Sequence, residues 1–185
     1  DVEKVADLGS PDLIQAGALV TAGFDGARFR DATGIVITEV ETGRQRLWAG
    51  WERPLDVDDW EVPESEVHQS VADLMGSYEV WRGNADPPHW VEQVGMWSGR
   101  WPGVWEEWWT NRLRPMAYAV RAYSEAIGSG AVTFEVGRDP GREEDLARHI
   151  GNAGRKDINL WGDDGLMVKV GDQVTAGQQI AKVGT

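Results

Sequence analysis

The sequence predicts an α/β domain built around a mixed β-sheet, and two features of the chain lead to this prediction. Strand-like runs rich in apolar residues lie at 20–24, 33–41 and 44–51, separated by turn residues. From residue 63 onward, segments with helical spacing of apolar residues alternate with short strand-like segments. A length of 185 residues suits one domain with a full core and a small appendage.

The first three predicted strands form an antiparallel meander. They span Val20 to Phe24, Thr33 to Glu41 and Arg44 to Trp51. The turn between the last two strands contains Gly43, which supplies the positive φ that a tight turn needs. Residues 1–18 are polar and rich in turn residues, so we expect them to form a linker.

Helices and strands then alternate. Pro63 begins a helix in which Val67, Val71 and Leu74 share one face with Met75, and Gly76 is expected to end it. The remaining predictions are strands at 78–85, 104–109 and 132–136 and helices at 90–99, 113–127 and 142–153.

This order of elements is that of a ribonuclease-H-like domain, an α/β fold with a mixed sheet. Three antiparallel strands come first, alternating helices and strands follow, and a right-handed crossover places the fourth strand beside the first. We expect this domain over residues 19–165. Residues 166–185 alternate valines with glycine turns, which predicts a self-contained C-terminal β-hairpin of different character.

Composition limits the chemistry of the chain. The absence of cysteine excludes disulfides and thiolate metal sites, and three scattered histidines do not favour a zinc site. Carboxylates are therefore the expected cation ligands, and Mg²⁺ or Mn²⁺ suits them better than zinc. No Gly-x-x-x-x-Gly-Lys-Ser/Thr motif is present to bind a nucleoside triphosphate.

Charge and hydropathy limit the partners. The net charge of -13 argues against broad attraction to nucleic acid, so such binding needs a local basic surface, bound cations or a partner. No run of about 18 apolar residues could span a membrane. The acidic N-terminus lacks the features of a signal peptide, so we expect neither membrane association nor secretion.

Two aspartates follow predicted strands and are the main candidate metal ligands. Asp25 comes at the end of the first strand, before Gly26, and Asp86 follows the fourth strand, before Pro87. If the fourth strand lies beside the first, both carboxylates meet at one edge of the sheet. The alternative is that both residues only form turns. Asp31 is either a third carboxylate of this site or a cap of the turn into the second strand.

Basic and aromatic residues supply further candidates, each with a structural alternative. Phosphate contact is one interpretation of the basic stretch, and a solvated helix face balanced by acidic residues is the other. This stretch contains Arg138, Arg142, Arg148, Arg155 and Lys156. His89 either positions a water or a phosphate or is structural. The tryptophans between residues 90 and 109 are expected mostly in the core, with a stacking platform for bases or sugars as the alternative.

Five separate motifs resemble the nuclease half of large terminase subunits from tailed phages of actinobacteria. The resemblance covers about residues 1–165, and the motifs come in the expected order. They are VTAGFDGARFRDAT at 20–33, ADPPHW at 85–90, WWTNR at 108–112, MAYAVRAY at 116–123 and LARHIGNA at 146–153.

The resemblance implies a divalent-cation-dependent endonuclease that cuts concatemeric double-stranded phage DNA during packaging. Asp25 and Asp86 match catalytic ligands of two Mg²⁺ or Mn²⁺ ions, which hydrolyse the phosphodiester bond. The implied partners are double-stranded DNA, the terminase ATPase domain, the small terminase subunit and the portal. The implied location is the cytoplasm of the infected bacterial host.

The chain departs from this family after Gly165, where the family's third metal-binding acid is not matched. Besides Asp31, the candidates to replace it are Asp157, Asp163 and Asp164, which no motif supports. The alternative function is therefore a catalytically incomplete terminase-like interaction module or a chimeric chain.

The tail at 166–185 resembles the hairpin of biotinyl or lipoyl carriers and of lysostaphin-type zinc peptidases. It lacks the Met-Lys-Met of the carriers and the His-x-His of the peptidases, so we expect it to have no chemistry of its own. A third interpretation takes the tail as part of a carrier or a cell-wall hydrolase.

Overall fold

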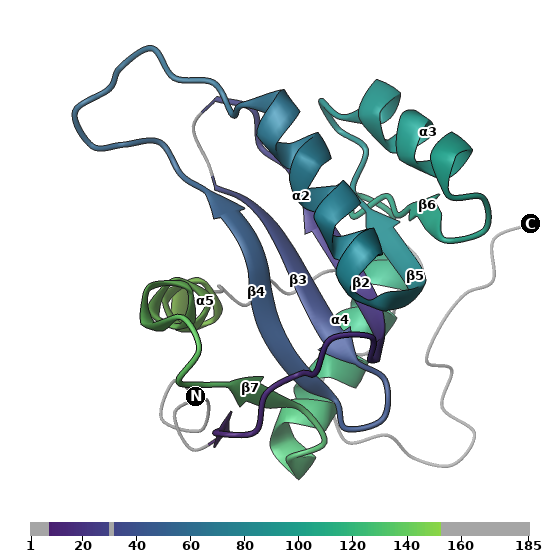
Figure 1. Ribbon diagram of the computed structural model, residues 1–185, viewed down its shortest axis with the longest axis vertical. Helices are drawn as coiled ribbons and strands as arrows, with labels where there is room; N and C mark the ends of the chain where they lie inside the picture. Colours follow the sequence, from purple (N-terminus) through teal and green to yellow (C-terminus); the bar gives the residue numbers. More distant parts are fainter. Residues whose placement is uncertain (1–7, 30–31, 153–185) are drawn as a thin grey trace, which may run out of the picture.

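The computed structural model describes residues 8–29 and 32–152, and these residues form an α/β fold (Figure 1). A mixed sheet of seven strands and four helices accounts for the described part of the chain, which confirms the predicted α/β class with a mixed sheet. The strands are β1 (Gly9–Ser10), β2 (Leu19–Asp25), β3 (Thr33–Glu39), β4 (Arg44–Trp51), β5 (Glu79–Ala85), β6 (Trp105–Glu107) and β7 (Thr133–Glu135). The helices are α2 (Glu64–Ser77), α3 (Val91–Arg100), α4 (Leu113–Ser129) and α5 (Pro140–Asn152).

The strand order across the sheet is β1-β7-β4-β3-β2-β5-β6. Strands β2, β3 and β4 form the predicted antiparallel meander. Strand β5 pairs in parallel with β2, and β6 pairs in parallel with β5. The fourth predicted strand therefore lies beside the first, as expected.

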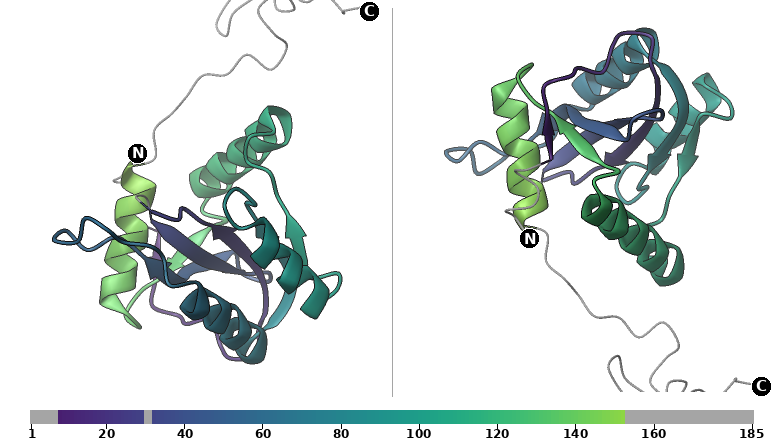
Figure 2. Two further views of the ribbon diagram at one scale, coloured as in Figure 1. Left: turned by 90° about the horizontal axis from the view of Figure 1, so that it is seen from above. Right: turned by 90° about the horizontal axis from the view of Figure 1, so that it is seen from below.

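The sheet separates two layers of helices. Figure 2 shows α2 and α3 on one face and α4 on the opposite face, while α5 lies beside β4. None of the helices in the described residues is both long and apolar enough to cross a bilayer.

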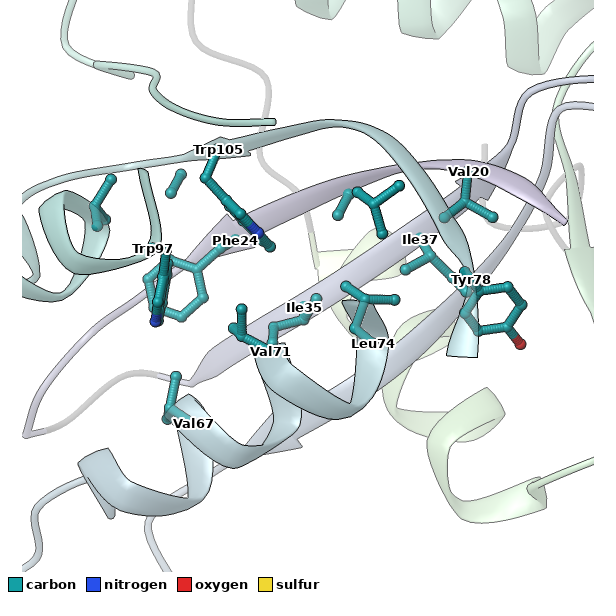
Figure 3. Packing of buried hydrophobic residues seen from close by; sticks show 14 of the residues in the cluster. Val20, Phe24, Ile35, Ile37, Val67, Val71, Leu74, Tyr78, Trp97 and Trp105 are labelled. Carbon is teal, nitrogen blue, oxygen red and sulfur yellow. The ribbon is translucent and has the colours of Figure 1, made fainter. Parts of the chain in front are cut away.

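The main core lies between the sheet and α2. Strands β2 and β3 alternate buried and more exposed residues, so one face of each strand points toward this helix. In Figure 3 the side chains of Val67, Val71 and Leu74 extend from α2 toward Ile35 and Ile37, and all five are fully buried. Burial of this apolar surface is the main source of stability that the fold provides.

Tryptophans complete this core toward α3 and β6. Trp90, Trp97 and Trp105 are buried, as predicted for most of the cluster, whereas Trp108 is exposed. The ring of Phe24 makes edge-to-face contacts with Trp90 and Trp97, at centroid distances of 5.3 and 5.1 Å.

The predicted linker at residues 1–18 reaches into the fold. Gly9 and Ser10 form β1, which pairs with β7, and Ile14 is fully buried in the core. The backbone N–H of Ile14 donates to the buried carboxylate of Glu135 at 2.7 Å. The sequence did not predict this because a two-residue strand has no periodicity and its partners lie more than 120 residues away. The predicted hairpin at 166–185 lies outside the described residues.

Candidate functional site

The structure brings Asp25 and Asp86 to the same edge of the sheet. Asp25 is the last residue of β2 and Asp86 directly follows β5, where Phe24 and Ala85 are register partners. The backbone N–H of Asp86 donates to the carbonyl of Phe24 at 3.0 Å, which fixes the two strand ends against each other. The structure therefore contains the parallel strand pair on which the predicted approach of the two aspartates depends.

The carboxylate of Asp86 is oriented by Thr110, in the loop between β6 and α4. The Thr110 hydroxyl donates to Oδ2 at 2.6 Å and its backbone N–H donates to Oδ1 at 3.3 Å. A carboxylate oxygen has two lone pairs, so each Asp86 oxygen can still accept a cation. Asp86 is half-buried and Asp25 is exposed, which suits a site open to a large substrate.

The loops that follow the two strands pack against each other. A Cβ on Gly26 would lie 2.5 Å from Nε1 of Trp90, so only glycine fits at this contact. Arg28 donates to the carbonyl of His89 at 3.3 Å, and its guanidinium lies 5.7 Å from the centre of the Trp90 ring. Arg28 thus connects the loop after Asp25 to the loop after Asp86.

An acidic residue at the start of α2 and another shortly before this helix hold the same arginine. Arg28 donates to Glu61 at 2.7 Å and to Glu64 at 3.0 Å. A hydrogen bond from Gln93, together with the charge of Arg28, lowers the pKa of Glu64 below its ordinary value. Glu64 therefore stays ionised at neutral pH, and the position of Arg28 is determined by two carboxylates.

His89 has a backbone conformation that histidine seldom adopts. Its φ is +66°, and it is the only non-glycine residue in the described ranges with a positive φ. Such a conformation costs a non-glycine residue roughly 1–3 kcal/mol. Sequence reasoning considered His89 as a candidate without predicting this feature.

A third acid for the site is not established by the structure. Among residues 8–29 and 32–152, no group of three or more histidine, cysteine, aspartate or glutamate residues could hold a metal ion. Asp31, Asp157, Asp163 and Asp164 lie outside the described residues. The two strand-end aspartates fit a hard divalent cation by ligand type, but by themselves they provide only part of a coordination shell.

Sequence reasoning missed one acidic residue near this edge. Glu107 ends β6 and is the register partner of Ala85, which directly precedes Asp86. Its carboxylate accepts a hydrogen bond from the Trp109 indole at 2.9 Å. Glu107 lies inside the predicted strand at 104–109 and not at its end, so its position in the sequence did not mark it as a strand-end acid.

Two of the predicted phosphate-binding arginines, one just before α5 and one within it, are held by ion pairs. Arg138 pairs with the buried Glu135 at 2.6 Å, and Arg142 pairs with Asp139 at 3.3 Å. Together with Arg46 of β4, these residues line a small cavity of about 20 Å³, which is room for one water molecule. This contact region fastens α5 to the sheet. Arg155 and Lys156 lie outside the described residues.

Arg148 of α5 pairs with an acidic residue that follows the end of a strand. It donates at 2.8 Å to Glu52, which also contacts His149 at 2.6 Å. Glu52 directly follows β4, and the strand pairing places the end of β4 two strands from Asp25 at the same edge. The hydrogen bond from Arg148 lowers the pKa of Glu52 below its ordinary value.

Comparison of the chain with protein-family models, curated proteins and solved structures finds no match. The terminase resemblance therefore depends on the sequence motifs described above. The parallel pairing of β2 with β5 is an observation that does not depend on those motifs.

Proposed function

We propose that the chain is a ribonuclease-H-like, divalent-cation-dependent DNA endonuclease, the nuclease domain of a phage packaging terminase. The observation that carries this proposal is the pairing of β2 with β5, which puts Asp25 and Asp86 at adjacent strand ends. The strand order β4-β3-β2-β5-β6 supports it, because three antiparallel strands followed by two parallel ones are what that fold requires.

In this proposal Asp25 and Asp86 hold the catalytic cations. When bound, two ions of Mg²⁺ or Mn²⁺ activate a water and stabilise the leaving oxygen of the phosphodiester. Thr110 fixes the rotamer of Asp86 through both carboxylate oxygens. A third acid would come from Asp31, Asp157, Asp163 or Asp164.

Because the chain is acidic, binding to DNA requires a basic residue near the candidate site. Arg148 is exposed close to the same sheet edge, and its side chain can exchange Glu52 for a phosphate oxygen. The net charge of -13 suits a domain that receives double-stranded DNA from an ATPase motor and a portal in the host cytoplasm. We assign the small terminase subunit as a further partner on the motif resemblance alone.

Cleavage of supercoiled plasmid in Mn²⁺ tests this function. The wild-type chain is expected to nick and linearise the plasmid, whereas Asp25→Asn and Asp86→Asn lose about 100-fold or more in rate, or about 2.7 kcal/mol of barrier. Asp73→Asn is the matched control, because Asp73 is an exposed acid on α2. Equal cleavage by wild type and both strand-end variants would contradict the proposal.

A second candidate is a catalytically incomplete terminase-like interaction module. The observation that favours it is that the chain departs from the family's motifs after Gly165, where the third acid of the family is not matched. Calorimetry with Mn²⁺ separates the two functions, because a complete site binds the ion stoichiometrically and Asp86→Asn removes that binding. Weak binding that is equal in the wild type and Asp86→Asn would favour the interaction module.

A further inference from the structure

The tight turn that follows Asp86 contains a histidine in a backbone conformation that favours glycine or asparagine. The N–H of Trp90 donates to the carbonyl of Pro87 at 2.7 Å, so residues 87–90 form a β-turn. Pro88 takes the second position and His89 the third, with φ at +66°. Proline followed by a residue of positive φ describes a type II turn, in which the third position favours glycine or asparagine.

The surrounding contacts maintain this conformation without using the imidazole. Arg28 binds the carbonyl of His89, and the next residue, Trp90, is fully buried. The His89 side chain itself is exposed, so burial of the ring does not offset the backbone cost. Strain of this kind is typical of residues whose side chains serve a function.

The turn lies at the edge where substrate would have to approach. It begins directly after Asp86, and its Trp90 packs against Gly26, which directly follows Asp25. His89 is therefore close to both strand ends, although it belongs to neither strand. An imidazole N–H is a donor suited to a phosphate oxygen.

We propose that His89 contacts a backbone phosphate of DNA beside the cleavage site, an inference that rests on the nuclease function proposed above. In this role His89 is a substrate-contacting residue and not a metal ligand. The His89 side chain is exposed beside this edge, where glycine would relieve the backbone but leave the phosphate without its donor.

Two substitutions in the full chain separate backbone strain from substrate contact. His89→Gly suits the turn, so its melting temperature is expected to rise by about 2–4 °C. Its Mn²⁺ affinity is expected to stay unchanged, while plasmid cleavage falls about 10–100-fold through loss of a charge-assisted hydrogen bond. His89→Asn tolerates the same φ and keeps a donor, so its cleavage is expected to stay within about threefold of wild type.

The outcomes distinguish this inference from the nuclease assignment. If the wild type cleaves DNA and Asp86→Asn does not, but His89→Gly cleaves within twofold of wild type, the His89 contact is wrong and the nuclease function stands. Loss of Mn²⁺ binding in His89→Gly would also overturn it, because His89 would then act on the metal site. A wild type that neither cleaves DNA nor binds Mn²⁺ would overturn both.

Discussion

The two faces of the sheet are covered very differently, although each has an amphipathic helix beside it. On one face, α2 buries Val67, Val71 and Leu74 completely. On the other face, no residue of α4 is buried, and Val120 remains 52% exposed. The spacing of apolar residues in α4 is as regular as in α2, so this pattern predicts a helix without determining how much of it is covered.

The face of the sheet that stabilises the fold is therefore not the face toward which Asp25 points. By strand alternation, Leu19, Thr21, Gly23 and Asp25 point away from the core, toward the face of α4. The α2 face therefore provides the packing that holds the strands in register. The sparsely covered face and its edge leave Asp25 accessible.

Truncation of one apolar side chain on each face should show the largest contrast. Leu74→Ala leaves a cavity in the core and is expected to lower the free energy of unfolding by about 2–5 kcal/mol. Val120→Ala is expected to change it by no more than about 0.5 kcal/mol, because Val120 is largely exposed. Equilibrium urea unfolding measures both. Similar losses would mean that α4 is covered in solution.

Two glycine-to-alanine substitutions near the α2 face are expected to change the free energy of unfolding in opposite directions. A Cβ on Gly83 would lie 2.6 Å from the Trp105 ring, so Gly83→Ala is expected to lose about 1–3 kcal/mol by overpacking. Gly76 lies in α2 with no heavy atom within 4 Å of such a Cβ, so Gly76→Ala is expected to gain about 0.5–1 kcal/mol. Thermal unfolding of the pair measures the difference. A stable Gly83→Ala variant would show that Trp105 can move and that the core near Asp86 is loosely packed.

Local pattern was sufficient to predict most of the strands and helices. Alternation placed β2, β3 and β4 within two residues of their ends, and the positive φ expected at Gly43 is confirmed at +71°. Helix α2 continues one residue past the predicted stop at Gly76, because a glycine without a positive φ need not end a helix. Strand β1 could not be predicted, since only its distant pairing with β7 defines it.

The pairing of the two strands that carry the candidate aspartates was predictable, but the contacts around these residues were not. The order of elements was enough to predict that β5 pairs in parallel with β2, so that both strands end at the same edge of the sheet. The hydrogen bonds from Thr110 to Asp86 depend on how the chain returns after β5, which residue spacing does not encode. Similarly, Arg148 has a partner 96 residues away, so its ion pair with Glu52 could not be predicted from nearby acids alone.

One hydrogen bond between α4 and the sheet provides a further test of how firmly this helix is held. The Tyr123 hydroxyl donates to Gln45 of β4 at 2.8 Å, and partial burial raises the pKa of Tyr123 above its ordinary value. Tyr123→Phe removes this bond and is expected to lower the free energy of unfolding by about 0.5–1.5 kcal/mol. Urea unfolding at neutral pH measures this change.

The same residue predicts how stability changes at alkaline pH. Because the folded-state pKa of Tyr123 is raised, its contribution is complete below the unfolded value of about 10 and is lost as pH rises through the folded pKa. The stability difference between wild type and Tyr123→Phe should therefore shrink above about pH 10. A difference that is constant with pH would mean that Tyr123 is solvated and that Gln45 does not hold α4. Helix α4 would then be held to the sheet even less firmly than its exposure indicates, which would strengthen the contrast with the α2 face.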